Sequence, residues 1–330
     1  MSFDLDTLLK HPSNGYKDLI NCILSENKEQ FIHHWIEWKQ HQDFENLEGD
    51  SMLLFPLLYD KIEKYAVVDE NLPRYKGIIK KNWVFSTKNQ TYLNQIKACL
   101  LEEQIPFLLY GDYVLNTITT DFNYPIKSNT ISILVNQKDF MRSIKILTSL
   151  GCKKSIKSKI KEVFLGRNYT SFELKNTKVI LYKRPLSIPL KSQGLCNLIV
   201  NSSCENFIQD NITLYLYYMI IRSQTEFSTP KTNWIIYPFL MEKQYKIDWN
   251  LFIDLTLKDN TKFIILPAYK LLHHLDPLKF PTFVKDKLVD SKTSWWNNLE
   301  YYFATHKKSV LQQILRLSYY FFKGLLLKIG

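Results

Sequence analysis

Several features that identify common functional classes are missing from this chain or scarce in it. The 330 residues include only nine glycines, which argues against a glycine-rich barrel or a repeat protein. Walker-loop, GxGxxG, HExxH and nucleophile-elbow motifs are all absent, so no motif indicates P-loop, dinucleotide, zincin or serine-hydrolase chemistry. The longest uncharged apolar run, Ile212–Ile221, is too short to cross a bilayer.

Cysteine and histidine are also poorly arranged for metal binding. The five cysteines show no CxxC or Cys/His spacing, which is typical of a reduced, intracellular chain. His33–His34 and His273–His274 are adjacent pairs whose members point to different faces of a helix, so we assign no metal to them. The first residues are acidic where a signal peptide is basic and then apolar. We therefore expect a soluble, cytoplasmic protein.

Positive charge is the main compositional excess. The chain has 43 Lys and Arg against 32 Asp and Glu, a formal net charge of +11. Such a balance favours contact with phosphate, nucleic acid or an anionic membrane, although a lysine-rich proteome explains it equally well. The hydrophobic content of 45% is ample for a sizeable core.

Residues 1–100 are predicted to be mostly helical. Apolar residues at helical spacing define one face of an early segment: Ile32, Trp35, Ile36 and Trp38. Pro56 is expected to interrupt the leucine-rich segment that follows, and a long helix is expected from Trp83 to Leu101. We expect Trp35, Trp38 and Trp83 to pack in a core or between domains rather than to stack on a ligand.

The pattern changes after Pro106. We predict two strands, a helix and a hairpin there: Phe107–Tyr110, Thr130–Val135, the helix Asp139–Leu150, and the hairpin strands Thr170–Leu174 and Lys178–Tyr182. A helix-like segment is expected after Gly111, and Gly151 is expected to end the helix Asp139–Leu150. After residue 185 the pattern is helical again.

The predicted fold class is therefore α/β in the α+β sense. A small mixed sheet backed by helices lies between N-terminal and C-terminal helical parts. We predict an N-terminal helical region over residues 1–100, an α/β core over 101–185 and a C-terminal helical domain over 186–330.

Five segments, in this order, resemble the uncharacterised nucleotidyltransferases of the DNA polymerase β-like superfamily. The resemblance extends from about Trp35 to about Val289. The segments are LLFPLLYDKI (Leu53–Ile62), the helix Leu72–Leu93, IPFLLYGDYVL (Ile105–Leu115), ISILVNQKDFMRSIKILTSLGC (Ile131–Cys152) and IDWNLFIDL (Ile247–Leu255). The resemblance implies that residues 101–185 form a nucleotidyltransferase core.

The resemblance also implies where a metal site would lie, and its carboxylates are missing. The superfamily uses three carboxylates on neighbouring strands to hold two metal ions. Carried over by position, two of them fall on Thr130 and Ser132 and the third on Ile180. A hydroxyl is neutral and a weak ligand for Mg²⁺, which prefers charged oxygen donors. We therefore expect no catalytic residue, no bound metal and no cofactor.

The nucleotide-binding positions that the resemblance implies are partly altered. Gly111 is retained, Tyr110 replaces a lysine before it, and Lys127 lies near the place of an arginine. Three other acids are the candidates for a shifted metal site: Asp112, Asp121 and Glu173. Glu173 is the strongest of them because its predicted strand adjoins that of Ile180.

Three functions follow from these patterns. The first is a catalytically degenerate nucleotidyltransferase-like protein that acts as a binding or accessory protein for a nucleotide, peptide or protein partner in a biosynthetic pathway. The second is an active transferase with a shifted carboxylate site, which would need Mg²⁺ and a nucleoside triphosphate. The third is a basic protein that acts on a membrane surface or on nucleic acid.

Two segments carry the third function. Lysines in Lys153–Lys161 can follow the phosphates of a nucleic acid, or they guard an edge strand against pairing. Ser309–Gly330 has one apolar face and basic flanks. It is either an amphipathic helix on an anionic membrane or partner groove, or a terminal helix docked on the body.

Overall fold

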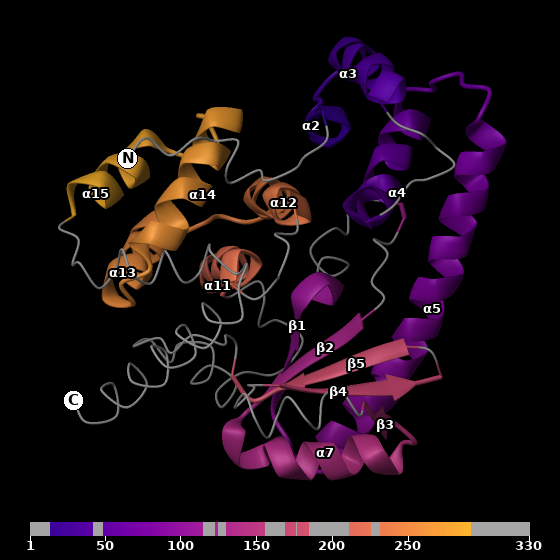
Figure 1. The fold of residues 1–330 in the computed structure, drawn as a ribbon, viewed down its shortest axis with the longest axis vertical. Coiled ribbons are helices and arrows are strands. Elements are labelled where there is room, and N and C mark those ends of the chain that lie inside the picture. The colour runs from indigo at the N-terminus through magenta and orange to yellow at the C-terminus, as the bar shows by residue number, and fades with distance from the viewer. Residues whose placement is uncertain are drawn as a thin grey trace, which may run out of the picture.

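The computed structural model describes residues 14–41, 49–114, 123–124, 130–155, 169–175, 177–184, 211–225 and 232–291. Helices form both ends of this part of the chain, and the described strands form one sheet between them (Figure 1). The structure is therefore a mixed α+β fold, as predicted. The C-terminal segment Ser309–Gly330 and the lysines beyond residue 155 lie outside the described residues.

Four helices precede the sheet: α2 (Asn14–Leu24), α3 (Lys28–His41), α4 (Gly49–Lys64) and α5 (Leu72–Glu102). Trp35 and Trp38 are buried, as expected, but Ile36 is 52% exposed. The prediction for Ile36 was wrong. The buried residues of α3 are four and three positions apart: Phe31, Trp35 and Trp38. Ile36 follows Trp35 by one position and therefore lies off this buried face.

The prediction that Trp83 packs in a core or between domains was also wrong, because its side chain is 55% exposed. Helix α5 begins 11 residues before Trp83, just ahead of Pro73. Its buried residues are three, four or seven positions apart, which keeps them on one face: Tyr75, Ile79, Asn82, Asn89, Leu93, Ile96 and Leu100. Trp83 lies one position off this stripe and faces outward.

Pro56 does not interrupt α4, contrary to prediction. The helix continues through it to Lys64. An internal proline costs roughly 3 kcal/mol because it removes one helical hydrogen bond. Its neighbours are fully buried: Leu54, Phe55, Leu57 and Leu58. Burying each such side chain contributes about 1.5–3 kcal/mol, so packing outweighs the cost of the proline.

The sheet has the order β1-β2-β5-β4-β3. Its strands are β1 (Phe107–Tyr110), β2 (Thr130–Val135), β3 (Lys153–Lys154), β4 (Tyr169–Leu174) and β5 (Thr177–Tyr182). Strands β2 and β5 run parallel and the other pairs are antiparallel. The predicted strands and the hairpin are confirmed. Strand β3 places Lys153 and Lys154 at the sheet edge, where lysines discourage further pairing.

Each face of the sheet is covered by a different set of helices. One face packs against α5 and α7 (Phe140–Ser149), and its buried residues include Ile131, Val179 and Phe172. The opposite face belongs to the larger cluster and faces α11 (Ile212–Thr225). In Figure 1, α7 lies below the sheet and α11 above it. Because side chains alternate along a strand, the two faces carry separate sets of residues.

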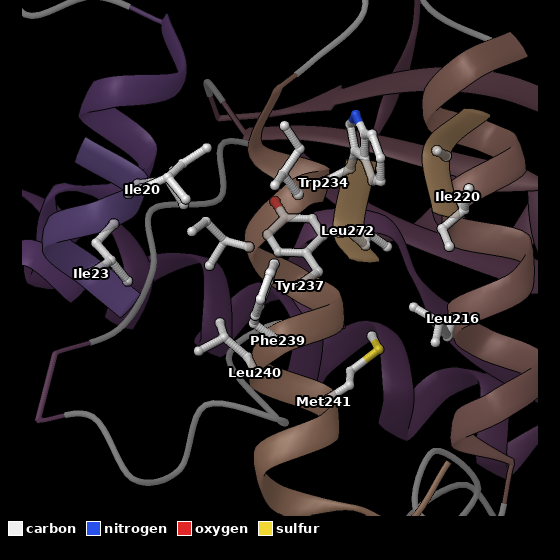
Figure 2. Packing of buried hydrophobic residues seen from close by; sticks show 14 of the residues in the cluster. Ile20, Ile23, Leu216, Ile220, Trp234, Tyr237, Phe239, Leu240, Met241 and Leu272 are labelled. Atoms are coloured by element: carbon white, nitrogen blue, oxygen red, sulfur yellow. The ribbon is translucent and has the colours of Figure 1, made fainter. Parts of the chain in front are cut away.

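The C-terminal helices continue the larger cluster. They are α11, α12 (Ile236–Gln244), α13 (Trp249–Lys258), α14 (Lys262–Leu275) and α15 (Thr282–Asp290). Figure 2 shows side chains of α11, α12 and α14 with Ile20 and Ile23 of α2, all of which belong to this cluster. It therefore joins residues from all three predicted regions, and the boundaries at 100 and 185 stay a prediction. No described helix is both long enough and apolar enough to span a membrane.

Candidate functional site

The residues predicted from the family resemblance meet at the centre of the sheet. Ser132 on β2 is paired with Tyr110 on β1 and with Ile180 on β5. Directly paired residues present their side chains on the same face, so these three form one row across three strands. Thr130 lies on the same face two residues earlier, opposite Lys178. Tyr110, Ser132 and Ile180 are buried, and Thr130 is half-buried.

Arg222 of α11 lies over this row. The carbon at the centre of its guanidinium is 4.5 Å from the ring centroid of Tyr110 and 5.2 Å from that of Tyr182. Its Nη2 donates a hydrogen bond of 2.8 Å to the Tyr182 hydroxyl. A cation over an aromatic face is attracted by the ring quadrupole, most strongly where water is excluded. Arg222 is therefore held in place by two tyrosines.

Gly111 lets the guanidinium approach the end of β1. Its φ of +77° is in the left-handed region that favours glycine. A Cβ at this position would lie 2.6 Å from Arg222 Nη1 and 3.4 Å from Ser132 Oγ. The Tyr215 hydroxyl donates to the Gly111 carbonyl oxygen at 3.1 Å. Tyr215 and Arg222 are two turns apart on one face of α11, so the helix binds the glycine turn at two points.

Sequence reasoning missed Arg222, although the sequence contains a signal for it. Arg222 is the first charge after the apolar run Ile212–Ile221. In the structure this run forms a helix that is buried almost all round. Arg222 continues the same helix, which ends at Thr225. Its charge therefore needs partners within the fold, because an unpaired buried charge is costly.

These groups do not fit the pair of metal ions that the family resemblance implies. The groups on this face are the hydroxyls of Thr130 and Ser132, the phenols of Tyr110 and Tyr182, the Ile180 side chain and the Arg222 guanidinium. Divalent magnesium is held by carboxylate and carbonyl oxygens. A fixed positive charge also opposes it: two like unit charges about 4 Å apart repel by about 4 kcal/mol at an effective dielectric constant of about 20.

The alternative acids do not restore the site within the described residues. Strand β4 neighbours β5, as predicted, but the partner of Ile180 is Ser171. Glu173 is exposed and stands in register with Lys178 on one side and Lys153 on the other. Its negative charge is therefore flanked by two lysines. The backbone of Asp112 follows Gly111 in the 3-10 turn Gly111–Val114, and Asp121 and Lys127 lie outside the described residues.

A second group of possible ligands lies on α3, and sequence reasoning had dismissed it. The ring centroids of His33 and His34 are 5.1 Å apart, so the adjacent imidazoles do not diverge as expected. Glu37 lies 3.6 Å from His33 Nε2 and 3.3 Å from His34 Nδ1. Within the described ranges this is the one group of three metal-binding side chains, with ligand atoms within 4.8 Å of one another. Imidazole and carboxylate are ligands that zinc accepts.

Two described thiols are unsuited to nucleophilic chemistry. Burial raises the pKa of the Cys22 thiol, and it raises the pKa of Cys152 to about 11. The thiolate is the reactive form of cysteine, so neither side chain is activated at neutral pH.

Comparison of the chain with protein-family models, with curated proteins and with solved structures gave no match. The likeness to nucleotidyltransferases therefore stays a prediction. The function has to be argued from the geometry of the residues themselves, of which the contact between Gly111 and Arg222 is the most specific.

Proposed function

We propose that this chain is a nucleotidyltransferase-like protein that does not transfer nucleotides and acts as a binding or accessory protein. The observation that carries the proposal is the position of the Arg222 guanidinium, packed against Gly111 and over the ring of Tyr110. The family resemblance would place metal ions beside these residues, and the chain places an internal cation there instead.

This row of residues differs from the metal site that the family resemblance implies in its charge as well as in its ligand types. Three carboxylates would make the row negative and attract divalent cations. Thr130, Ser132 and Ile180 are neutral, and Arg222 adds a positive charge next to them. A guanidinium attracts phosphate directly, without a bridging metal. Nucleotide binding at this site would therefore be independent of Mg²⁺.

The alternative of an active enzyme with a shifted site is less well supported. Glu173 is the acid on the adjoining strand, and lysines flank it on both sides. One exposed carboxylate between two ammonium groups has little tendency to hold a divalent ion. The third function, that of a membrane or nucleic-acid protein, depends mainly on segments outside the described residues and stays a prediction.

Calorimetry with ATP, GTP, CTP and UTP, each with and without Mg²⁺, tests the proposal. We expect any nucleotide that binds to do so with an affinity that Mg²⁺ does not increase. Arg222→Met removes the charge and nearly keeps the side-chain length, so it should weaken such binding. An affinity that rises tenfold or more with Mg²⁺, and that falls again in Glu173→Ala, would favour the active enzyme instead.

A further inference from the structure

A separate pocket lies between α4 and α5, and it shares no lining residue with the sheet site. Its volume is about 490 Å³, which is within the range of about 300–1,000 Å³ that is usual for small-ligand sites. Eight residues line it: Tyr59, Glu63, Lys76, Ile79, Lys80, Trp83, Asn123 and Tyr124. The proposed function uses none of these residues.

Trp83 gives this pocket an aromatic wall. Its side chain is 55% exposed and lines the pocket. Within the described part of the chain it has no ring contact and no hydrogen bond, unlike the packed pair Trp35 and Trp38. An indole ring left open to solvent offers a flat face on which another aromatic ring can stack.

Two lysines add positive charge beside the indole. Lys76 and Lys80 are one turn apart on α5, and Trp83 follows at a spacing of three, so the three side chains share one side of the helix. Both lysines are exposed, and no ion pair involves them among the residues described. Their ammonium groups are therefore available to an anion.

The opposite side of the pocket is already fixed by internal contacts. The Tyr124 hydroxyl donates a short hydrogen bond to the Glu63 carboxylate, and its ring packs against Tyr59 at 5.2 Å between centroids. Asn123 donates two hydrogen bonds to Asp60, from its backbone and from its side chain. Burial and the Glu63 carboxylate raise the pKa of Tyr59 to about 12, so its phenol stays neutral. The Glu63 carboxylate is thus held by a hydrogen bond, and the two lysines outnumber it, so the lining of the pocket has a net positive charge.

We propose that this pocket binds a nucleoside monophosphate or a closely similar aromatic phosphate, with its ring on Trp83 and its phosphate on Lys76 and Lys80. Stacking of one base on an aromatic side chain contributes about 1–3 kcal/mol. Lysine ammonium groups bind phosphate as point charges and do not demand a fixed geometry. An acidic peptide would use the lysines but would leave the indole without a partner.

Calorimetry on the full chain with three probes tests the proposal. AMP supplies both ring and phosphate, adenosine supplies the ring, and ribose 5-phosphate supplies the phosphate. We expect AMP to bind at least tenfold more tightly than either fragment. Trp83→Ala should weaken AMP binding by about thirtyfold, which corresponds to the middle of the range for a lost stacking contact. Replacing Lys76 and Lys80 together by Gln should remove the preference for AMP over adenosine.

Matched controls lie on the same helix. Val84→Ala removes a neighbouring exposed apolar side chain, and Lys81→Gln removes a neighbouring exposed lysine. Neither residue lines the pocket, so neither change should affect AMP binding. Circular dichroism of each variant checks that it is folded.

Three results would overturn the proposal: no AMP binding to the native chain, equal losses of AMP binding in Trp83→Ala and Val84→Ala, or AMP binding no tighter than that of a glutamate-rich peptide. Arg222→Met separates this pocket from the sheet site. It should leave AMP binding at the pocket unchanged, whereas loss of all AMP binding in Arg222→Met alone would place the ligand at the sheet and contradict the pocket.

Discussion

At the scale of single residues, the contact between Gly111 and Arg222 explains more than any other. It requires a residue without a Cβ, because the guanidinium occupies the space that a Cβ would fill. It also places a positive charge where the family resemblance implies metal ions. The family resemblance explains Gly111 by a nucleotide-binding turn, whereas the structure explains it by packing against Arg222.

Gly111→Ala should destabilise the fold. A left-handed conformation costs a non-glycine residue roughly 1–2 kcal/mol, and the new Cβ would also displace the guanidinium. We expect the free energy of unfolding, measured with urea, to fall by about 2 kcal/mol or more. Gly77→Ala is the matched control. Gly77 lies in α5, and no neighbouring atom lies within 4 Å of the place that a Cβ would take, so this change should stabilise by about 0.5–1 kcal/mol. Equal effects of the two changes would contradict the account.

Lys61 predicts a dependence of stability on pH. Burial, followed by the charges of Lys64 and Lys243, lowers its pKa from 10.5 to about 8. Between these values the unfolded chain holds the proton and the folded chain does not. Stability contributed by this group therefore rises as pH increases through the window.

The measurement compares the native chain with Lys61→Met. The free energy of unfolding of the native chain minus that of the variant should increase between pH 8 and pH 10.5, by about 1–2 kcal/mol once solvent screening of this partly exposed group is allowed for. A difference that stays constant or decreases across the window would show that the environment of Lys61 is not the one described.

At the scale of elements, α11 connects the sheet to the C-terminal helices. Its Tyr215 and Arg222 reach the sheet, and its Tyr217 reaches the turn between α13 and α14. The Tyr217 hydroxyl donates to Asp259 Oδ2 at 2.9 Å and lies 2.8 Å from Thr261 Oγ1. Burial and the Asp259 charge raise the pKa of Tyr217, so the phenol keeps its proton. One helix thus anchors both parts.

Tyr217→Phe tests this connection. The change deletes one hydroxyl and takes a donor away from a buried carboxylate, which costs about 1–3 kcal/mol. We expect a lower midpoint of urea unfolding with no change in the slope of the transition. Tyr245→Phe, which removes the hydroxyl of a half-buried tyrosine at the end of α12, serves as the control and should have a smaller effect. A loss no greater than that of the control would mean that the network is not a significant anchor.

At the scale of the whole molecule, local patterns predicted the elements better than their placement. Strands β1 and β2 were predicted with their observed bounds because each is a short apolar or β-branched run beside a glycine or a polar loop. The exposure of Trp83 and the position of Arg222 were not predicted. Both depend on which face of a long helix is covered by a distant segment, and Arg222 meets Gly111 across 111 positions of sequence.

The candidate site could be predicted only in part. The family resemblance placed Thr130, Ser132 and Ile180 on neighbouring strands, and side-chain alternation placed Thr130 and Ser132 on one face. The pocket between α4 and α5 could not be predicted, since its wall combines residues near position 60, near position 80 and at 123–124. The N-terminal helices, the C-terminal helices and one face of the sheet share one large hydrophobic cluster. The sheet site, the pocket and α11 therefore belong to one packed body.

The central proposal, that a cation lies where the family resemblance implies metal-binding acids, is tested most directly by nucleotide transfer. The purified full chain is incubated with Mg²⁺ and each labelled nucleoside triphosphate, alone and with candidate acceptors, and incorporated label is counted. The account predicts incorporation no higher than in a reaction without protein. Incorporation by the native chain that Glu173→Ala abolishes, in a variant shown to be folded, would contradict it.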